Sequence, residues 1–148
     1  MDDATRTIIL DLLARHNIMT LATIRPDGFP QATTVYYVND DFILYFATDR
    51  ASQKAGNLAL NDKVSVAIAS ETANAYKLKA LSLSGRAIKI IEPARALDLQ
   101  LRLFKAVPAA KRFAPIESKQ LVAYSIAPVA ISLVDYATGY GRTFLEEF

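Results

Sequence analysis

The order of apolar and polar residues predicts a chain built mainly from short strands joined by tight turns. Apolar residues alternate with small or polar ones over several stretches, as they do in half-buried strands. These stretches are 18–24, 29–38, 42–47, 64–70, 76–91 and 120–136. The first two are separated by Arg25-Pro26-Asp27-Gly28, where proline pre-sets φ and glycine accepts a positive φ. We therefore expect a hairpin there, because such short connections join antiparallel strands.

Helical spacing is confined to three places in the chain. Residues 4–16 place apolar side chains three and four positions apart, and this helix is expected to end near His16. Residues 51–60 tolerate a short helix, and Pro93 opens a third one in the first-turn position that proline favours. The apolar face of that third helix is expected to consist of Leu97, Leu101 and Phe104.

Two residues interrupt the later strands. Gly85 lies within the stretch 76–91 and Pro128 within 120–136, so each predicts a bulge or a sharp bend. Five or six strands joined largely by hairpins exclude a doubly wound parallel sheet, which needs long crossover connections. The sequence therefore predicts a mostly β fold, an antiparallel barrel with peripheral helices, in a single domain over residues 1–148.

Composition narrows the class of protein. Apolar residues make up 52% of the 148, which favours a packed core over disorder. The net charge is only +2, with basic residues spread along the chain, so no nucleic-acid partner is expected. No apolar run approaches the ~18 residues of a membrane span, and the N-terminus does not resemble a signal peptide. We expect a cytoplasmic protein with no membrane attachment.

Metal chemistry is also restricted. The chain has no cysteine, and His16 is its only histidine, so no thiolate or histidine-rich metal site is expected. His16 stands where the first helix ends, a position that favours a cation because carbonyl groups gather there.

The stretch 48–58, TDRASQKAGNL, carries the strongest chemical signal. Thr48 lies at the exit of a predicted strand, and Ser52 and Lys54 lie at the start of the short helix that follows. Hydroxyl groups, free N–H groups of a first helical turn and a lysine ammonium together make a phosphate site. The alternative is that Ser52 simply caps the helix while Lys54 is solvated, since serine caps are common.

The order of motifs around this stretch resembles the pyridoxamine 5′-phosphate oxidase-like, FMN-binding split-barrel family. The family pattern is a D-G-x-P turn, a strand ending in threonine, an S-x-K segment and an N-L pair. Here these are, in order, Asp27-Gly28-Phe29-Pro30, Thr48, Ser52-Gln53-Lys54 and Asn57-Leu58. The resemblance implies a six-stranded split barrel that works as a homodimer, with FMN at the subunit interface.

The resemblance also implies roles for individual residues. Ser52, Gln53 and Lys54 match the segment that holds the FMN phosphate, although the family often has arginine at the position of Gln53. Arg25 or Arg50 could replace that missing charge. The segment that runs along the flavin ring and ribityl chain is matched by Thr33, Thr34, Val35 and Tyr36. The same four residues are also good strand formers, which would explain them without a ligand.

Three further residues are expected near the flavin. Ala80 falls near the position at which the oxidases place a glutamine that contacts the ring, so that side-chain contact is absent here, and Lys79 beside it is the expected substitute. Tyr140 and Arg142 belong to a C-terminal tail that in shorter relatives often reaches the partner's flavin, Tyr140 by stacking and Arg142 by pairing with an anion. The alternative is that this tail is a frayed end.

These observations lead to three functional hypotheses. The first is an FMN-dependent oxidoreductase acting on an unknown small molecule, with no catalytic residue assigned. The second is a deazaflavin-dependent reductase of the same fold, and the third is a flavin-binding or sensing protein without turnover. Vitamin B6 oxidation itself is not expected, because the true oxidases carry a further segment with tryptophan and arginine, and this chain has no tryptophan. Haem binding is disfavoured, because only His16 offers an imidazole for iron.

Overall fold

The computed structural model describes residues 1–112, 119–138 and 143–148. The strands in this part of the chain are β1 Ile18–Ile24, β2 Pro30–Tyr36, β3 Val38–Asp40, β4 Ile43–Asp49, β5 Lys63–Ala69, β6 Lys79–Lys89, β7 Leu121–Asp135 and β8 Thr143–Glu147. The helices are α1 Asp3–Arg15, α2 Gln53–Leu60 and α3 Pro93–Ala106, with 3₁₀ turns η1 Ala75–Lys77 and η2 Pro108–Arg112.

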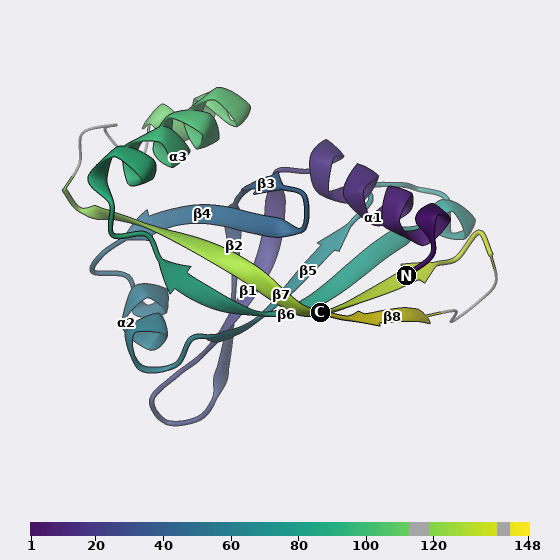
Figure 1. The fold of residues 1–148 in the computed structure, drawn as a ribbon, viewed down its shortest axis with the longest axis horizontal. Coiled ribbons are helices and arrows are strands. Elements are labelled where there is room, and N and C mark those ends of the chain that lie inside the picture. Colours follow the sequence, from purple (N-terminus) through teal and green to yellow (C-terminus); the bar gives the residue numbers. More distant parts are fainter. Residues whose placement is uncertain (113–118, 139–142) are drawn as a thin grey trace.

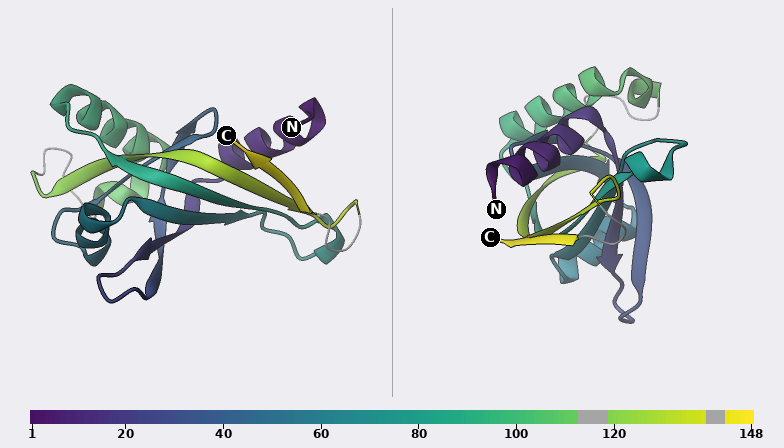
Figure 2. Two further views of the ribbon diagram at one scale, coloured as in Figure 1. Left: turned by 60° about the horizontal axis from the view of Figure 1, so that its bottom comes forward. Right: turned by 90° about the vertical axis from the view of Figure 1, so that its right-hand side faces the viewer.

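The strands form one antiparallel sheet in the order β2-β1-β5-β6-β7-β4-β3, with β8 added to β7. The sheet curls round into a barrel-like arc, which is clearest in the right-hand view of Figure 2. The predicted class, a split antiparallel barrel with peripheral helices, is confirmed. The prediction of six strands corresponds to the six longer ones, and β3 and β8 are additional because neither has a sequence period of its own.

The barrel is open between β2 and β4. Within residues 1–112, 119–138 and 143–148, β2 pairs only with β1, and β4 pairs with β7 on one side and with the three-residue β3 on the other. β2 and β4 contact each other, yet no ladder of hydrogen bonds joins them in the described residues. We call this gap between β2 and the second half of β4 the seam.

The helices cover two sides of the sheet. α1 and α2 pack against the core that the curled sheet encloses. Leu99 of α3 packs on the opposite face of the sheet, with Tyr45, Ile90 and Ala123. Figure 1 shows where the three helices lie around the sheet. The first helix is capped by Asp2, whose carboxylate accepts a hydrogen bond from the N–H of Thr5 at 2.7 Å, and it ends at His16 as predicted. No described helix is long and apolar enough to cross a bilayer.

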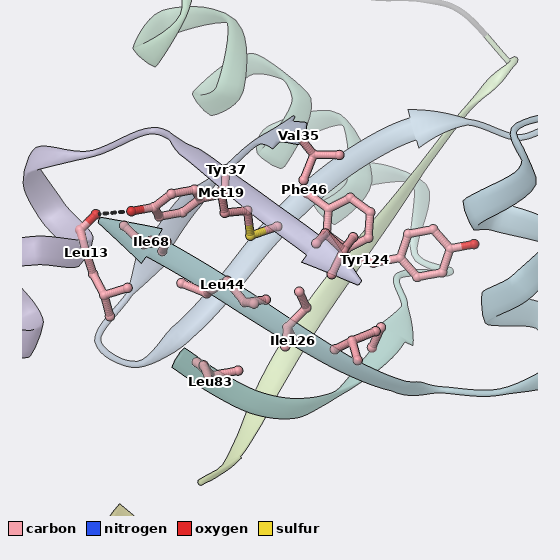
Figure 3. Close-up of a cluster of buried hydrophobic side chains, with 14 of the residues drawn as sticks. Leu13, Met19, Val35, Tyr37, Leu44, Phe46, Ile68, Leu83, Tyr124 and Ile126 are labelled. Atoms are coloured by element: carbon pink, nitrogen blue, oxygen red, sulfur yellow. Dashed lines mark hydrogen bonds between the residues drawn. The ribbon is translucent and has the colours of Figure 1, made fainter. Parts of the chain in front are cut away.

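The core fills the barrel with side chains from every long strand and from α1 (Figure 3). Leu21, Leu44 and Ile126 are fully buried. The side chain of Tyr37 is also buried, and its hydroxyl donates a hydrogen bond to the carbonyl of Leu13 at 2.9 Å. Burial raises the pKa of this phenol, so the hydroxyl remains a donor that ties α1 to the end of β2.

The third helix buries a different face from the one predicted. Leu97 and Leu101 are exposed, whereas Leu99, Leu103 and Phe104 are buried. Two apolar stripes overlap on this helix, and the sequence does not say which one meets the sheet. Only Phe104 of the predicted face is correct.

Gly85 and Pro128 mark the predicted irregularity and lie opposite each other. The register of β6 against β7 shifts between Ser84 and Gly85, so Val129 is an extra residue on β7. Pro128 lies in the part of β7 between its pairings with β4 and β8, where its missing N–H breaks no ladder. A Cβ at Gly85 would lie 2.7 Å from the carbonyl oxygen of Ala127, which only glycine avoids.

Replacing this glycine should therefore destabilise the fold. We expect Gly85→Ala to lower the free energy of unfolding by about 1–3 kcal/mol, because the new methyl group must displace backbone. The control is Gly56→Ala in α2, where a Cβ meets nothing within 4 Å and should add about 0.4–1 kcal/mol. Denaturant unfolding of the two variants measures both, and equal midpoints would contradict the role assigned to Gly85.

Candidate functional site

The connector from β4 to α2 is held by its own polar side chains. Ser52 is the N-cap of α2, and its Oγ accepts a hydrogen bond from the N–H of Ala55 at 3.3 Å. The hydroxyls of Thr48 and Ser52 are hydrogen-bonded to each other at 3.2 Å. Asp49 accepts a hydrogen bond from the N–H of Ala51 at 2.7 Å, which tightens the turn. These contacts fix where α2 begins and therefore where Lys54 lies.

A cleft of about 260 Å³ follows the seam. We call it the seam cleft. Its polar side is formed by Thr34, Tyr36, Thr48, Lys54 and Gln100. Its apolar side is formed by Val35, Ala47, Leu103, Phe104, Ala110 and Leu121. The cleft thus lies between the free edge of β2, the end of β4 and the buried face of α3.

In the described part of the chain, Lys54 is the only charged side chain that lines the seam cleft. It is half-buried, and no carboxylate pairs with it among residues 1–112, 119–138 and 143–148. The adjacent first turn of α2 has N–H groups that no helical carbonyl can reach, and this helix end carries partial positive charge. An ammonium, a hydroxyl from Thr48 and these amides can together hold an anion at one end of an otherwise apolar cleft.

Five of the predicted site residues meet in the seam cleft. They are Thr34, Val35, Tyr36, Thr48 and Lys54. Ser52 does not line the cleft, but its hydroxyl is hydrogen-bonded to that of Thr48, which does. Gln53 faces solvent and accepts a hydrogen bond from the side-chain amide of Gln31 at 2.9 Å. Thr33 is half-buried on the same face of β2 as Val35 but does not line the seam cleft, and its hydroxyl has no hydrogen-bond partner in the described residues.

The remaining predicted residues lie elsewhere. Lys79 lines a separate cleft beside the end of α1 and forms an ion pair with the buried Asp135, at 3.6 Å between Nζ and Oδ2. Within one chain the structure therefore does not bring Lys79 to the seam cleft. Tyr140 and Arg142 lie outside the described residues.

Neither arginine proposed to replace the missing charge at Gln53 lies in the seam cleft. Arg25 is held at the tip of the β1–β2 hairpin by an ion pair with Asp27, at 2.6 Å. Arg50 lines a cleft on the other side of α2. Among the residues that the structure describes, the end of the seam cleft beside α2 therefore has one cationic side chain, that of Lys54.

Most of the chain matches a known family. A family model described as pyridoxamine 5′-phosphate oxidase matches residues 6–135 of this chain. The chain belongs to this family. A comparison with curated protein sequences finds no match.

Solved structures of several bacterial proteins have the same fold. General Stress Protein 26 from Bacillus anthracis is 21% identical with a TM-score of 0.77, and the match covers 97% of this chain and 98% of that one. A heme binding protein from Mycobacterium smegmatis is 22% identical with a TM-score of 0.83, and the match covers 99% of this chain but only 59% of that one. The heme storage protein HutZ from Vibrio cholerae is 13% identical with a TM-score of 0.69, covering 82% and 88%. At these identities the similarity shows the shared fold alone.

In this member of the pyridoxamine 5′-phosphate oxidase family, the seam cleft is also lined by residues that the sequence analysis did not predict as site residues. Gln100, Leu103 and Phe104 of α3 form one wall of the seam cleft. Gln100 is buried although it is polar. A polar residue on the buried stripe of an amphipathic helix is a signal that could have been recognised, but only once the buried stripe was known.

The motif residue Asn57 has a structural role in this family member. Its side-chain amide donates hydrogen bonds to the hydroxyl of Thr23 at 2.9 Å and to the side-chain oxygen of Gln31 at 3.1 Å. Asn57 and Thr23 are both almost fully buried. Together with Leu58 in the core, these contacts attach α2 to β1 and β2 and hold Lys54 at the seam cleft.

Removing this amide should loosen α2. We expect Asn57→Ala to lower the free energy of unfolding by about 1–3 kcal/mol, because Thr23 and Gln31 lose a buried donor. The matched control is Asn61→Ala, because the side chain of Asn61 accepts an exposed hydrogen bond from the N–H of Lys63. This change should alter the free energy of unfolding by less than about 0.5 kcal/mol. Chemical denaturation of both proteins measures the difference, and equal stabilities would show that the network does not anchor the helix.

Proposed function

We propose that this chain is a flavoprotein that binds FMN in the seam cleft and acts as an oxidoreductase on a small molecule. The observation that carries the proposal is the convergence of Lys54 and Thr48 with Thr34, Val35 and Tyr36 along one cleft. Membership of the pyridoxamine 5′-phosphate oxidase family supports it.

The cleft has the distribution of polar and apolar groups that FMN requires. Lys54, Thr48 and the first turn of α2 would hold the phosphate. The hydroxyls of Thr34 and Tyr36 suit the ribityl chain, while Val35, Leu103 and Phe104 suit a flat aromatic ring. When bound, the flavin supplies the redox chemistry, and the protein supplies position and charge.

The size of the cleft supports the proposed homodimer. Sites that enclose a ligand of this size measure about 300–1,000 Å³, whereas the seam cleft measures about 260 Å³. A second copy placed against the exposed edge of β2 would supply the missing wall. Lys79, Tyr140 and Arg142 remain predicted contributors to the flavin site from that partner.

Haem is the second candidate ligand, on a different surface. Two proteins of the same fold are named for binding or storing haem. In this chain His16 lines a cleft of about 340 Å³ whose other lining residues include Ile8, Asp11, Leu12, Arg15, Lys77 and Lys79. The imidazole offers an iron ligand, and the ammonium of Lys77 offers a partner for a carboxylate, whereas Lys79 already pairs with Asp135. FMN remains the preferred ligand, because the family motif residues lie in the other cleft.

Denaturing the purified protein and identifying the released molecule tests both candidates. Released FMN, with absorbance bands near roughly 370 and 450 nm before denaturation, is the expected result. A band near about 400 nm and a released porphyrin would replace the flavin proposal by the haem candidate, and a deazaflavin would be identified by its mass. If reduced nicotinamide nucleotides bleach the bound flavin, the protein is an enzyme, and if they do not, it binds flavin without turnover.

The homodimer is tested separately, because sedimentation of the same sample should give twice the mass of the chain.

Lys54→Ala tests the phosphate end of the site. It should weaken FMN retention by ~1.5–3 kcal/mol, the usual contribution of a hydrogen bond to a charged group. Lys63→Ala is the control, because Lys63 is exposed on β5 and does not line the seam cleft. Flavin dissociation constants of the two variants give the comparison, and an affinity unchanged by Lys54→Ala would remove Lys54 from the site.

A further inference from the structure

A second cleft lies on the other side of α2, where β6 ends and β7 begins. It measures about 270 Å³ and shares no lining residue with the seam cleft. Arg50 and Lys89 flank it, Tyr124 forms part of its floor, and Ala55, Gly56 and Ala59 of α2 form a wall of small side chains. We call it the Arg50 cleft.

The Arg50 cleft has positive charge that nothing in the described chain neutralises. Five of the eight described arginines form an ion pair with an aspartate, but Arg50 does not. Its guanidinium makes one long hydrogen bond, from Nε to the carbonyl of Lys119 at 3.4 Å. Lys89 likewise has no carboxylate partner in the described segments, and no Asp or Glu lines the cleft. Two cations around one concave surface favour an anion there.

Tyr124 adds a directed hydrogen-bond donor. Its ring stacks on Phe46 at 5.2 Å between centroids, and the residue is only 6% exposed. Figure 3 shows its hydroxyl pointing away from the core side chains, and this hydroxyl has no hydrogen-bond partner in the described residues. Burial raises the pKa of this phenol, although Arg50 opposes the shift, so the hydroxyl is a neutral donor at physiological pH.

The strand register places these groups together. Lys89 lies directly opposite Tyr124 in the pairing of β6 with β7, so their side chains project from the same face of the sheet. Arg50 directly follows β4, and its backbone N–H donates to the carbonyl of Gln120 just before β7. Arg50 and Lys89 therefore line the same cleft as the hydroxyl group of Tyr124.

The small side chains of α2 determine the shape of the ligand. A Cβ at Gly56 would meet nothing within 4 Å, so this wall consists of short side chains beside open space. A wall of short apolar side chains opposite a hydrogen-bond donor leaves room for a planar ring that carries an anionic group at one end.

We propose that the Arg50 cleft binds a small planar organic anion, with its carboxylate or phosphate between Arg50 and Lys89 and hydrogen-bonded to the hydroxyl of Tyr124. Its ring lies against Ala55, Gly56 and Ala59. This site is separate from the proposed flavin site, and the inference does not depend on FMN binding.

Calorimetric titration of the purified protein with benzoate, phenyl phosphate and neutral benzamide tests the site. Benzoate or phenyl phosphate should bind saturably with one site per chain, and the tighter of the two identifies the anionic group. Benzamide, which has the same shape without the charge, should bind at least about tenfold more weakly. Equal affinities of benzamide and both anions, or no saturable binding of any probe, would overturn the proposal.

Substitutions then assign the site to these residues. Arg50→Gln and Lys89→Gln should each raise the dissociation constant of the tighter anion about tenfold, because each removes a charge-assisted contact. Tyr124→Phe keeps the ring and should raise it about threefold to tenfold. Both cations are exposed, so their variants should fold, and thermal unfolding of all three variants verifies this.

Lys54→Gln is the matched control, because Lys54 lies on the opposite side of α2 in the seam cleft. It should leave the affinity for the anion unchanged while weakening flavin retention. Anion binding that is lost in Lys54→Gln and retained in Arg50→Gln and Lys89→Gln would place the probe in the seam cleft and overturn the proposal.

Discussion

The absence of a ladder between β2 and β4 is the constraint on which the candidate site depends. Two strand edges face each other there without exchanging hydrogen bonds. Backbone N–H and C=O groups at such edges need water, a ligand or another chain to satisfy them. Because the barrel stays open at this place, side chains from both faces of β2 reach the same cleft, Val35 from the core side and Thr34 and Tyr36 from the outer side.

The helix α2 adds a positively charged side chain, that of Lys54, to one end of this gap. Ser52 and Thr48 determine where the helix starts, and Asn57 and Leu58 attach it to the barrel. As a result Lys54 lines the seam cleft, whereas Ala55, Gly56 and Ala59 line the Arg50 cleft. One short helix therefore separates two clefts that each have unpaired positive charge in the described chain. Within the stretch TDRASQKAGNL, some residues therefore build the connector and others face the clefts.

The differences between prediction and structure have physical causes. Leu97 and Leu101 were expected to be buried, but α3 carries two overlapping apolar stripes, and only contact with β4 and β7 selects Leu99, Leu103 and Phe104. Lys79 lines a different cleft from Lys54 within one chain, and its ammonium pairs with the buried Asp135, so its predicted place near a flavin depends on a second copy of the chain. Strand β8 was missed because a strand that completes an existing sheet edge needs no strong period of its own.

The sequence by itself determined the local structure: the hairpin at Asp27-Gly28, the bulge at Gly85 and Pro128, the capped start of α2 and the order of motifs that defines the family. Each of these depends on backbone preferences or spacings within a few residues, which a sequence states directly. Only the tertiary structure decided which residues share a cleft. Thr34, Thr48, Lys54 and Phe104 come from four different elements, and their meeting depends on the curl of the sheet and on which face of α3 is buried. Those are properties of long-range packing, and no local pattern of residues specifies them.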